Sequence, residues 1–330
     1  MTDEDAFASG TGLIDVHQHA MPAAIKKLLV DRKILPPVGG PPFANWDLAS
    51  ALETMDATGI AVGLLSAAIP SEFLGPDEAF AATLTRTANE SIAEVVREHP
   101  TRFGLLAYLP LGYTDAALAE IAYAFDELGA DGIIIGSHHG DTYLGDPSFD
   151  KVFAELDRRR AVVLTHPFNL PSCPVTPLPS FLSDFMLDTT RAAIQLLTSG
   201  TLDRYPDISV ILPHGGGFLP YQAARLTLGS FLGFGLAADA IPDALRTFHY
   251  DTAGPMSPYA TPSLLAAAGA DRIVFGSDYN AVPVPGIKAN VAALRSDPAL
   301  DPASLAKIGR ENALRLFPTL AARLAGESDR

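Results

Sequence analysis

Cysteine, positive charge and long apolar runs are scarce in this chain of 330 residues. Cys173 is the one cysteine, which excludes an internal disulfide framework and fits the reducing cytoplasm. No run of roughly eighteen apolar residues is free of polar interruption, so the sequence predicts no transmembrane helix. The N-terminus is acidic and lacks the charged-then-apolar pattern of a signal peptide, so we expect residues 1–12 to be a flexible tail.

Basic residues are outnumbered by acidic ones, 23 against 38, which leaves a formal net charge of −15. A field of this sign argues against nucleic acid and against anionic membranes as partners. It also opposes the approach of an anionic substrate. Such a substrate would therefore need local positive groups or a metal ion at its binding site.

Apolar residues are abundant, at 48% of the chain, and they fall in short runs that alternate with helical patterns. This alternation predicts a single-domain (β/α)8 barrel over 13–318, followed by a last helix and tail at 319–330. The expected strands are 13–16, 60–66, 103–109, 132–135, 161–165, 209–212, 248–252 and 273–275. The clearest helices are expected at 48–58, 77–98, 114–128, 149–159 and 189–199.

Two proline-rich segments, 35–42 and 171–179, lie in connections that follow candidate ligand strands. Each is either a wall or lid of a site or a stiff surface connection.

The histidines gather where strands are expected to end. Of 8 in the chain, six lie at or just beyond such an end, and the carboxyl ends of barrel strands converge on one pocket. They are His17, His19, His138, His139, His166 and His214.

His17-Gln18-His19 places two imidazoles on the same side of an extended strand, at a spacing that can chelate one ion. Taken alone, such a pair also arises by chance. His166 ends its strand because Pro167 cannot continue the ladder, so the ring is presented at the tip. The alternative is a buried histidine bonded to a backbone carbonyl.

His214 is followed by three glycines, which permit a tight turn and suit a histidine that moves protons beside a metal. A glycine-rich turn with an incidental histidine is the alternative. Asp278 follows the eighth strand, which neighbours the first in a closed barrel. Histidines with one carboxylate suit zinc or another divalent transition metal. The segment 136–139 after the fourth strand contains no lysine, which argues against a two-metal site bridged by a carboxylated lysine.

Four motifs that contain these residues occur in order along the chain. They are Ile14-Asp15-Val16-His17-Gln18-His19, Thr165-His166-Pro167, Pro213-His214-Gly215-Gly216-Gly217 and Phe275-Gly276-Ser277-Asp278-Tyr279. Together they resemble the amidohydrolase superfamily, in the branch that contains α-amino-β-carboxymuconate-ε-semialdehyde decarboxylase and γ-resorcylate decarboxylase. The resemblance spans 13–317. The segments 130–132, 143–147, 158–163 and 188–191 are similar to the 6-methylsalicylate decarboxylase group.

The resemblance implies one divalent metal, zinc or alternatively manganese, held by His17, His19, His166 and Asp278. It also implies that His214 acts as general acid or base, and that a ring carbon is protonated before CO2 leaves. Whether Asp278, His214 or water supplies that proton stays open. A homodimer is expected from the same resemblance.

Arg225 follows His214 at the spacing of an arginine that, in the semialdehyde decarboxylase, crosses a dimer interface to the substrate carboxylate. A helix-surface or interface arginine is the alternative. That enzyme's second arginine has no counterpart in 45–48, which favours a monocarboxylated aromatic ring over a dicarboxylate. The remaining candidate pocket residues are Phe43, Trp46, His138, His139, Phe168 and Tyr279. Each of the four aromatic residues can equally be core, and one of the two histidines can merely satisfy a backbone group.

Three functions fit these features. The first is non-oxidative decarboxylation of a hydroxylated aromatic (salicylate-like) or related unsaturated acid, which the middle of the chain favours. The second is metal-dependent hydrolysis of a lactone or amide on the same scaffold, because a metal-bound hydroxide is a natural nucleophile. A binding protein that has lost catalysis is the third, and the presence of every key side chain argues against it.

Overall fold

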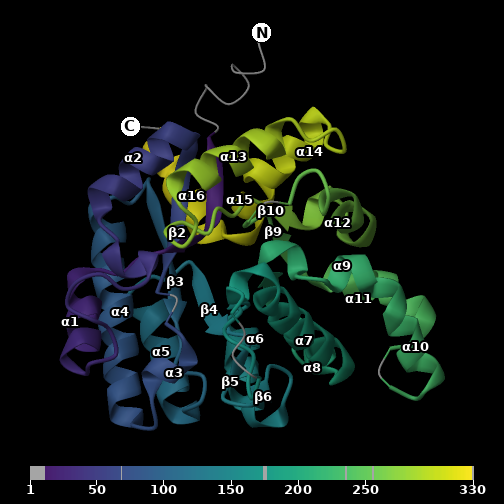
Figure 1. Cartoon of the computed structure of the whole chain (residues 1–330), viewed down its shortest axis with the longest axis horizontal. Coiled ribbons are helices and arrows are strands. Elements are labelled where there is room, and N and C mark those ends of the chain that lie inside the picture. Colours follow the sequence, from purple (N-terminus) through teal and green to yellow (C-terminus); the bar gives the residue numbers. More distant parts are fainter. Residues whose placement is uncertain (1–11, 68, 174–176, 235, 255, 329–330) are drawn as a thin grey trace.

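The computed structural model describes residues 12–67, 69–173, 177–234, 236–254 and 256–328 (Figure 1). Eight strands form one parallel sheet in the order β1-β2-β3-β4-β7-β8-β9-β10. Their bounds are β1 Leu13–His19, β2 Ile60–Ser66, β3 Phe103–Tyr108, β4 Gly132–Gly136, β7 Val162–His166, β8 Ser209–Leu212, β9 His249–Asp251 and β10 Ile273–Val274. The predicted tail at 1–12 falls almost wholly outside the described residues.

Backbone hydrogen bonds between the first strand and the segment that follows β10 close the sheet on itself. The Val16 amide donates to the Phe275 carbonyl at 2.9 Å, and the Asp278 amide donates to the His17 carbonyl at 2.9 Å. Gln18 and Tyr279 form a further parallel bridge. The architecture is therefore the predicted (β/α)8 barrel, and its seam runs through two of the predicted metal ligands.

Helices surround the barrel (Figure 1). The longer ones are α1 Ala23–Asp31, α2 Leu48–Thr58, α4 Glu78–Glu98, α5 Thr114–Asp126, α6 Asp150–Arg158, α7 Asp184–Thr198, α12 Thr261–Ala268, α13 Val284–Arg295 and α16 Pro318–Ser328. Shorter ones are α3 Ser71–Leu74, α8 Thr201–Arg204, α9 Leu219–Gln222, α10 Leu226–Phe231, α11 Ile241–Thr247, α14 Pro302–Ala306 and α15 Asn312–Leu316. No described helix has the length and apolar character needed to cross a bilayer.

Local chemistry explains where these helices begin, end and face. In α4, Asp77 accepts a hydrogen bond from the Phe80 amide at 3.1 Å and so caps the first turn. The apolar side chains Phe80, Leu84, Ala88 and Ile92 recur every four residues and are buried against the sheet. Gly59 ends α2 with a φ of 75°, a conformation that glycine adopts without strain.

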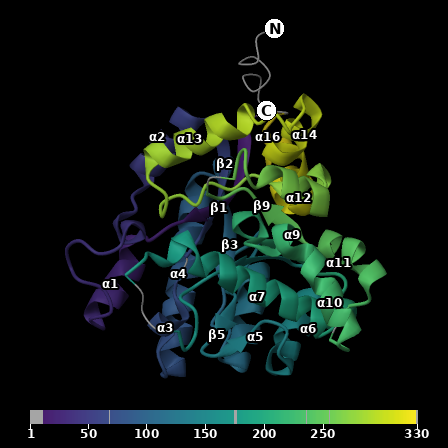
Figure 2. The same ribbon diagram turned by 45° about the vertical axis from the view of Figure 1, so that its right-hand side comes forward.

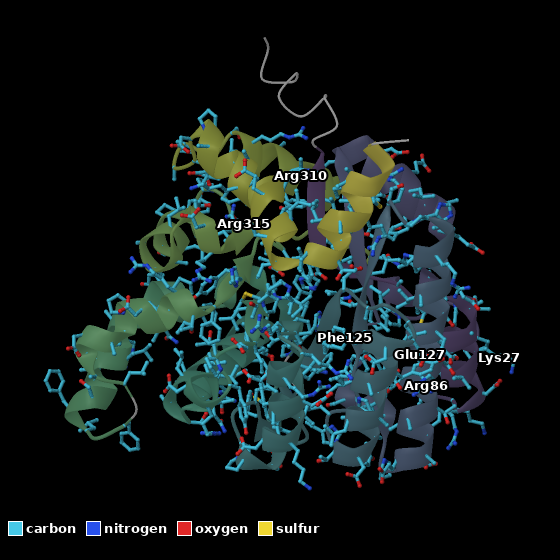
Figure 3. All side chains as sticks on the ribbon, turned by 180° about the vertical axis from the view of Figure 1, so that it is seen from behind. Lys27, Arg86, Phe125, Glu127, Arg310 and Arg315 are labelled. Atoms are coloured by element: carbon cyan, nitrogen blue, oxygen red, sulfur yellow. The ribbon has the colours of Figure 1, made fainter. Side chains whose placement is uncertain are left out.

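The strands are buried on both faces because side chains fill the barrel and helices cover its outside. At the foot of the barrel, Arg310 donates to the Gly12 carbonyl at 3.0 Å (Figure 3). Arg323 of α16 pairs with the buried Asp131 at 3.0 Å. These contacts tie the end of the chain to the start of strands β1 and β4.

Three parts of the fold differ from the sequence prediction. The first strand extends to His19, whereas β9 and β10 are shorter than expected. A small antiparallel hairpin, β5 His138–His139 with β6 Thr142–Tyr143, follows β4. Of the proline-rich segments, 35–42 leads into the 3-10 turn η1 Pro42–Asn45, and 174–176 lie outside the described residues.

One segment extends away from the barrel. It runs from α9 through the 3-10 turn η5 Ala223–Arg225 to α10, and α10 lies at the outer edge of both views (Figures 1 and 2). Six large apolar side chains of 218–234 are exposed there, namely Phe218, Tyr221, Leu228, Phe231, Leu232 and Phe234.

Candidate metal centre and active site

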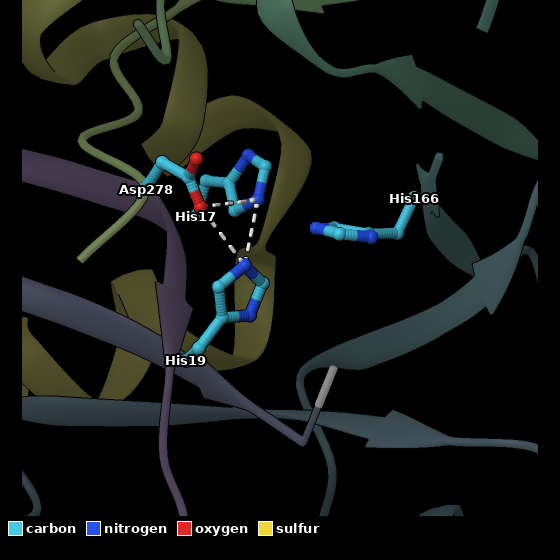
Figure 4. A group of neighbouring side chains, drawn as sticks. All are labelled: His17, His19, His166 and Asp278. Carbon is cyan, nitrogen blue, oxygen red and sulfur yellow. Dashed lines mark hydrogen bonds and ion pairs between the residues drawn. The ribbon is translucent and has the colours of Figure 1, made fainter. Parts of the chain in front are cut away.

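Four side chains from three separate parts of the barrel meet at the carboxyl ends of its strands (Figure 4). His17 and His19 come from β1, and residues two apart on a strand point to the same side. His166 is the last residue of β7, and Asp278 follows β10. One ligand atom of each lies within 4.8 Å of the others. The structure therefore brings together all four predicted metal ligands.

The spacing of three of these atoms fits a small metal ion. Nε2 of His17 and Nε2 of His19 are 3.1 Å apart, and Asp278 Oδ1 lies 3.0 Å from His19 Nε2. The distance from Asp278 Oδ1 to His17 Nε2 is 3.6 Å. A tetrahedral site with bonds of about 2.1 Å has edges of about 3.4 Å, so these atoms form one face of such a site. His166 approaches from the opposite side (Figure 4). The arrangement of these four residues thus fits one divalent metal.

The electrostatics of the cluster favour neutral and anionic ligands at most positions. Burial lowers the pKa of His19, and burial together with the neighbouring histidines lowers the pKa of His166 well below its usual value. Burial raises the pKa of Asp278, but hydrogen bonding to His19 and His214 and the charges of His17 and His19 outweigh it and hold that pKa well below its usual range. Asp278 is therefore an anion.

His17 behaves differently because it faces several carboxylates. Burial lowers its pKa, but Asp251, Asp278 and Asp15 outweigh burial and raise the pKa to about 9. A metal must displace this proton when it binds Nε2.

Asp251 is a further residue of this site that the sequence did not indicate. It ends β9, is fully buried, and its Oδ2 lies 2.7 Å from Nδ1 of His17. Ser66 Oγ lies 3.2 Å from Nδ1 of His19 in the same way. Such partners fix the tautomer and the direction of a ligating imidazole. Asp251 lies inside the expected strand 248–252, so its position did not distinguish it from an ordinary strand residue.

His214 lies beside the metal ligands. Its ring centroid is 5.4 Å from that of His17, and its Nε2 is 3.6 Å from Asp278 Oδ2. Its Nδ1 has no hydrogen-bond partner among the described residues. The next three glycines all have positive φ, as the sequence pattern predicts for a tight turn. The position suits proton transfer next to the metal.

Both His214 and Asp278 adopt the left-handed backbone conformation, with φ of 53° and 58°. For residues other than glycine this costs about 1 kcal/mol or more each. Such strain is concentrated at functional sites, because surrounding contacts must enforce it.

Apart from the histidines, the predicted pocket residues fall into three groups by burial. Phe168 and Tyr279 are buried next to the cluster, since the Phe168 ring centroid is 5.4 Å from that of His166 and Tyr279 adjoins Asp278 in the chain. Trp46 and Phe43 are partly buried against the core, and the Trp46 indole N–H has no partner among the described residues. Arg225 is exposed on η5.

Polar contacts hold the ring of His138, and packing holds the ring of His139. Nδ1 of His138 lies 2.8 Å from the Gly140 carbonyl, and Nε2 lies 3.2 Å from the Asn169 carbonyl and 3.6 Å from Asp188. The His139 ring packs over Gly112, where a Cβ would lie 2.0 Å from its Nε2.

Comparison with known proteins identifies the family. The family model described as Amidohydrolase matches residues 14–319. The chain belongs to this family. Among curated proteins, 6-methylsalicylic acid decarboxylase of Penicillium expansum is 36% identical over 282 residues, which cover 82% of this chain and 85% of the relative. The relatives thus confirm the resemblance that the four motifs indicated.

Solved structures show the same architecture. The 2,6-dihydroxybenzoate decarboxylase from Rhizobium has a TM-score of 0.75 at 26% identity and covers 94% of this chain and 99% of its own. The dihydroxybenzoic acid decarboxylase from Polaromonas sp. JS666, solved with bound manganese and the inhibitor 2-nitroresorcinol, has a TM-score of 0.77 at 25% identity. It covers 93% of this chain and 97% of its own.

Proposed function

We propose that this chain is a divalent-metal-dependent, non-oxidative decarboxylase of a hydroxylated aromatic acid of the salicylate type. The observation that carries the proposal is the cluster of three histidines and Asp278, in a chain similar over most of its length to a 6-methylsalicylic acid decarboxylase. Nε2 of His214 lies 3.6 Å from Oδ2 of Asp278 in this cluster. A hydrolase that acts on lactones or amides would use the same cluster, but no relative reported above carries that activity.

The reaction breaks the bond between the ring carbon and the carboxylate, and the electron pair stays on the ring. A proton must be added to the same carbon, and CO2 leaves. When bound, the metal supplies positive charge that attracts the oxygens of the acid and offsets the negative field of the protein. His214 and Asp278 lie where they can hold or move the proton, and Phe168 places an apolar ring beside His166.

Zinc and manganese both fit the donor set. Three imidazoles and one carboxylate suit zinc, which is our first choice. Manganese, present in the Polaromonas structure, is the alternative.

For the substrate, we propose that Arg225 binds the carboxylate and that Trp46, Phe168, His138 and Tyr279 line the ring pocket. Arginine suits this role because its fork matches a carboxylate. Because Arg225 is exposed, we propose that it reaches the pocket of a second copy of the chain.

We propose that this second copy docks on the segment 218–234 and forms a homodimer. Exposed apolar side chains there, such as Tyr221 and Phe231 at 84% and 81%, favour a protein interface. Arg225 lies within the same segment, which links dimer formation to the site. We place the enzyme in the cytoplasm, because its single cysteine fits a reducing compartment.

The test combines metal content with a substrate screen. The purified protein should contain about one transition-metal ion per chain, release CO2 from a substituted salicylate, and incorporate solvent deuterium at the vacated ring carbon. A metal-loaded protein that releases no CO2 from salicylates or benzoates but opens a lactone or amide would replace the proposal with the hydrolase. Weak metal binding without either reaction would favour a binding protein.

A further inference from the structure

Asp251 is a buried carboxylate beside the metal cluster that is not one of the four ligands. It is 0% exposed and lies at the carboxyl end of β9. Oδ2 lies 2.7 Å from Nδ1 of His17. Oδ1 accepts the backbone N–H of His214 at 2.7 Å and that of Ala253 at 3.0 Å. Both oxygens are therefore satisfied by donors, as a buried carboxylate requires.

The bond to His17 determines which ring nitrogen faces the metal cluster. Because Nδ1 donates to Asp251, Nε2 points toward His19 Nε2 at 3.1 Å and Asp278 Oδ1 at 3.6 Å. A carboxylate in this position fixes the ring and increases the basicity of the ligating nitrogen.

The bond to His214 acts on the backbone rather than on the ring. His214 has a φ of 53°, which a residue with a Cβ avoids unless its contacts enforce it. The N–H to Oδ1 bond is one such contact. This backbone conformation directs the ring so that Nε2 lies 3.6 Å from Asp278 Oδ2.

The packing at Gly276 shows that this arrangement needs space. A Cβ at Gly276 would lie 3.1 Å from Cβ of His17 and 3.2 Å from Cβ and Cγ of Asp251. Contacts this short are tighter than ordinary van der Waals contact, so glycine leaves room for the His17–Asp251 pair.

We propose that Asp251 is a positioning residue for two groups at once. One oxygen sets the tautomer and direction of His17 as a metal ligand. The other sets the backbone from which His214 reaches Asp278. The part of the proposal that concerns His214 (the His214 half) rests on the proposed function, in which His214 moves a proton. The part that concerns His17 (the His17 half) depends on metal binding alone.

The first experiment compares metal affinity in the full-length chain. Dissociation constants for Zn2+ and Mn2+ are measured by chelator competition for the unmodified protein, Asp251→Asn and Asp131→Asn. Asp131 is a matched control because it is also a buried carboxylate with a backbone N–H donor, but it lies at the opposite end of the strands and pairs with Arg323. Asp251→Asn should weaken metal binding about 10- to 100-fold, and Asp131→Asn should leave it unchanged. If Asp251→Asn binds each of the two metals as tightly as the unmodified protein does, the His17 half is overturned.

A second measurement tests the His17 half without the Asp251→Asn variant, in case that variant does not fold. In the unmodified protein, His17 Nδ1–H should give a strongly deshielded exchangeable proton in the NMR spectrum of a sample with 15N-labelled histidine, missing in His17→Gln. Absence of this signal in the unmodified protein would overturn the His17 half.

The His214 half is tested at saturating metal. Asp251→Asn should then still have a reduced kcat with a KM close to that of the unmodified protein. A kcat equal to that of the unmodified protein would overturn this half. If the unmodified protein shows no decarboxylation at all, the proposed function and the His214 half fall together, while metal affinity and the NMR signal still decide the His17 half.

Discussion

Asp278 faces His19 with one carboxylate oxygen and His214 with the other. Oδ1 lies 3.0 Å from His19 Nε2, and Oδ2 lies 3.6 Å from His214 Nε2. The same carboxylate thus belongs to the metal cluster and adjoins the proposed acid or base. Removal of Asp278 and removal of His214 should therefore have different consequences.

We expect His214→Ala to retain about one metal ion per chain and to lose turnover by roughly 100- to 10,000-fold. Asp278→Ala and His17→Ala should lose both metal and turnover, because each removes a ligand atom from the cluster. Elemental mass spectrometry after dialysis measures the metal, and CO2 release measures turnover. Equal metal loss in all three variants would contradict the role of His214.

The turn that carries His214 depends on Gly217, which has a φ of 63°. A Cβ there would lie 2.2 Å from the Met186 carbonyl oxygen of α7, and backbone cannot move away cheaply. Gly233 also has a positive φ, of 77°, but apart from its chain neighbours no atom of the described residues lies within 4 Å of its missing Cβ. Gly233→Ala should cost about 1 kcal/mol of unfolding free energy, and Gly217→Ala should cost clearly more and lower turnover. Urea denaturation compares them, and equal costs would show that the close approach is unimportant.

The stability of the metal-free protein should depend on His249 in acid. Burial, together with Arg272 and Arg315, lowers the pKa of His249 from 6.5 to about 4. Between these values the unfolded chain binds a proton that the folded chain does not, so stability falls as the pH falls from 6.5 to 4. The loss reaches up to about 3 kcal/mol. Unfolding free energies are measured for the unmodified protein and for His249→Asn across this pH range. The difference between them should change with pH by this amount.

Asp15 acts in the opposite direction, because burial raises its pKa from 3.8 to about 6. Its contribution to stability falls as the pH rises between those values. The unmodified protein and His249→Asn both contain Asp15, so the difference between their unfolding free energies isolates the contribution of His249. A difference that does not change with pH would contradict the prediction.

Arg225 provides a test of the dimer. His214→Ala and Arg225→Ala should each be inactive alone if both groups serve the site. If Arg225 acts across the interface, a mixture that exchanges subunits should regain about a quarter of full turnover, because half of the dimers contain one intact site. Phe231→Asp, which charges the exposed apolar segment, should give a monomer in sedimentation and abolish this rescue. No rescue between stable, exchanging dimers would show that Arg225 does not act in trans.

Strand positions and metal ligands were predictable because their signals are local. Apolar runs buried on both faces end at polar residues, and the barrel brings those ends together. His17, His19, His166 and Asp278 could therefore be assigned to one cluster without coordinates.

Asp251 could not be found in this way. It lies inside the expected strand 248–252, and its bond to His17 joins residues 234 positions apart. The hairpin that contains His138 and Tyr143 escaped prediction as well, since its two strands of two residues each are too short to show an alternating pattern. Exposed α10 has no periodic apolar face buried in this chain, and its side chains gain a role only with a partner.

The seam between β1 and the segment after β10 has a consequence for biosynthesis. His17 and His19 leave the ribosome early, whereas Asp278 and the Phe275 carbonyl that accepts from Val16 arrive more than 250 residues later. A nascent chain released before Asp278 has neither a closed barrel nor a complete ligand set. The four-ligand metal site can therefore form only after Asp278 has been synthesised.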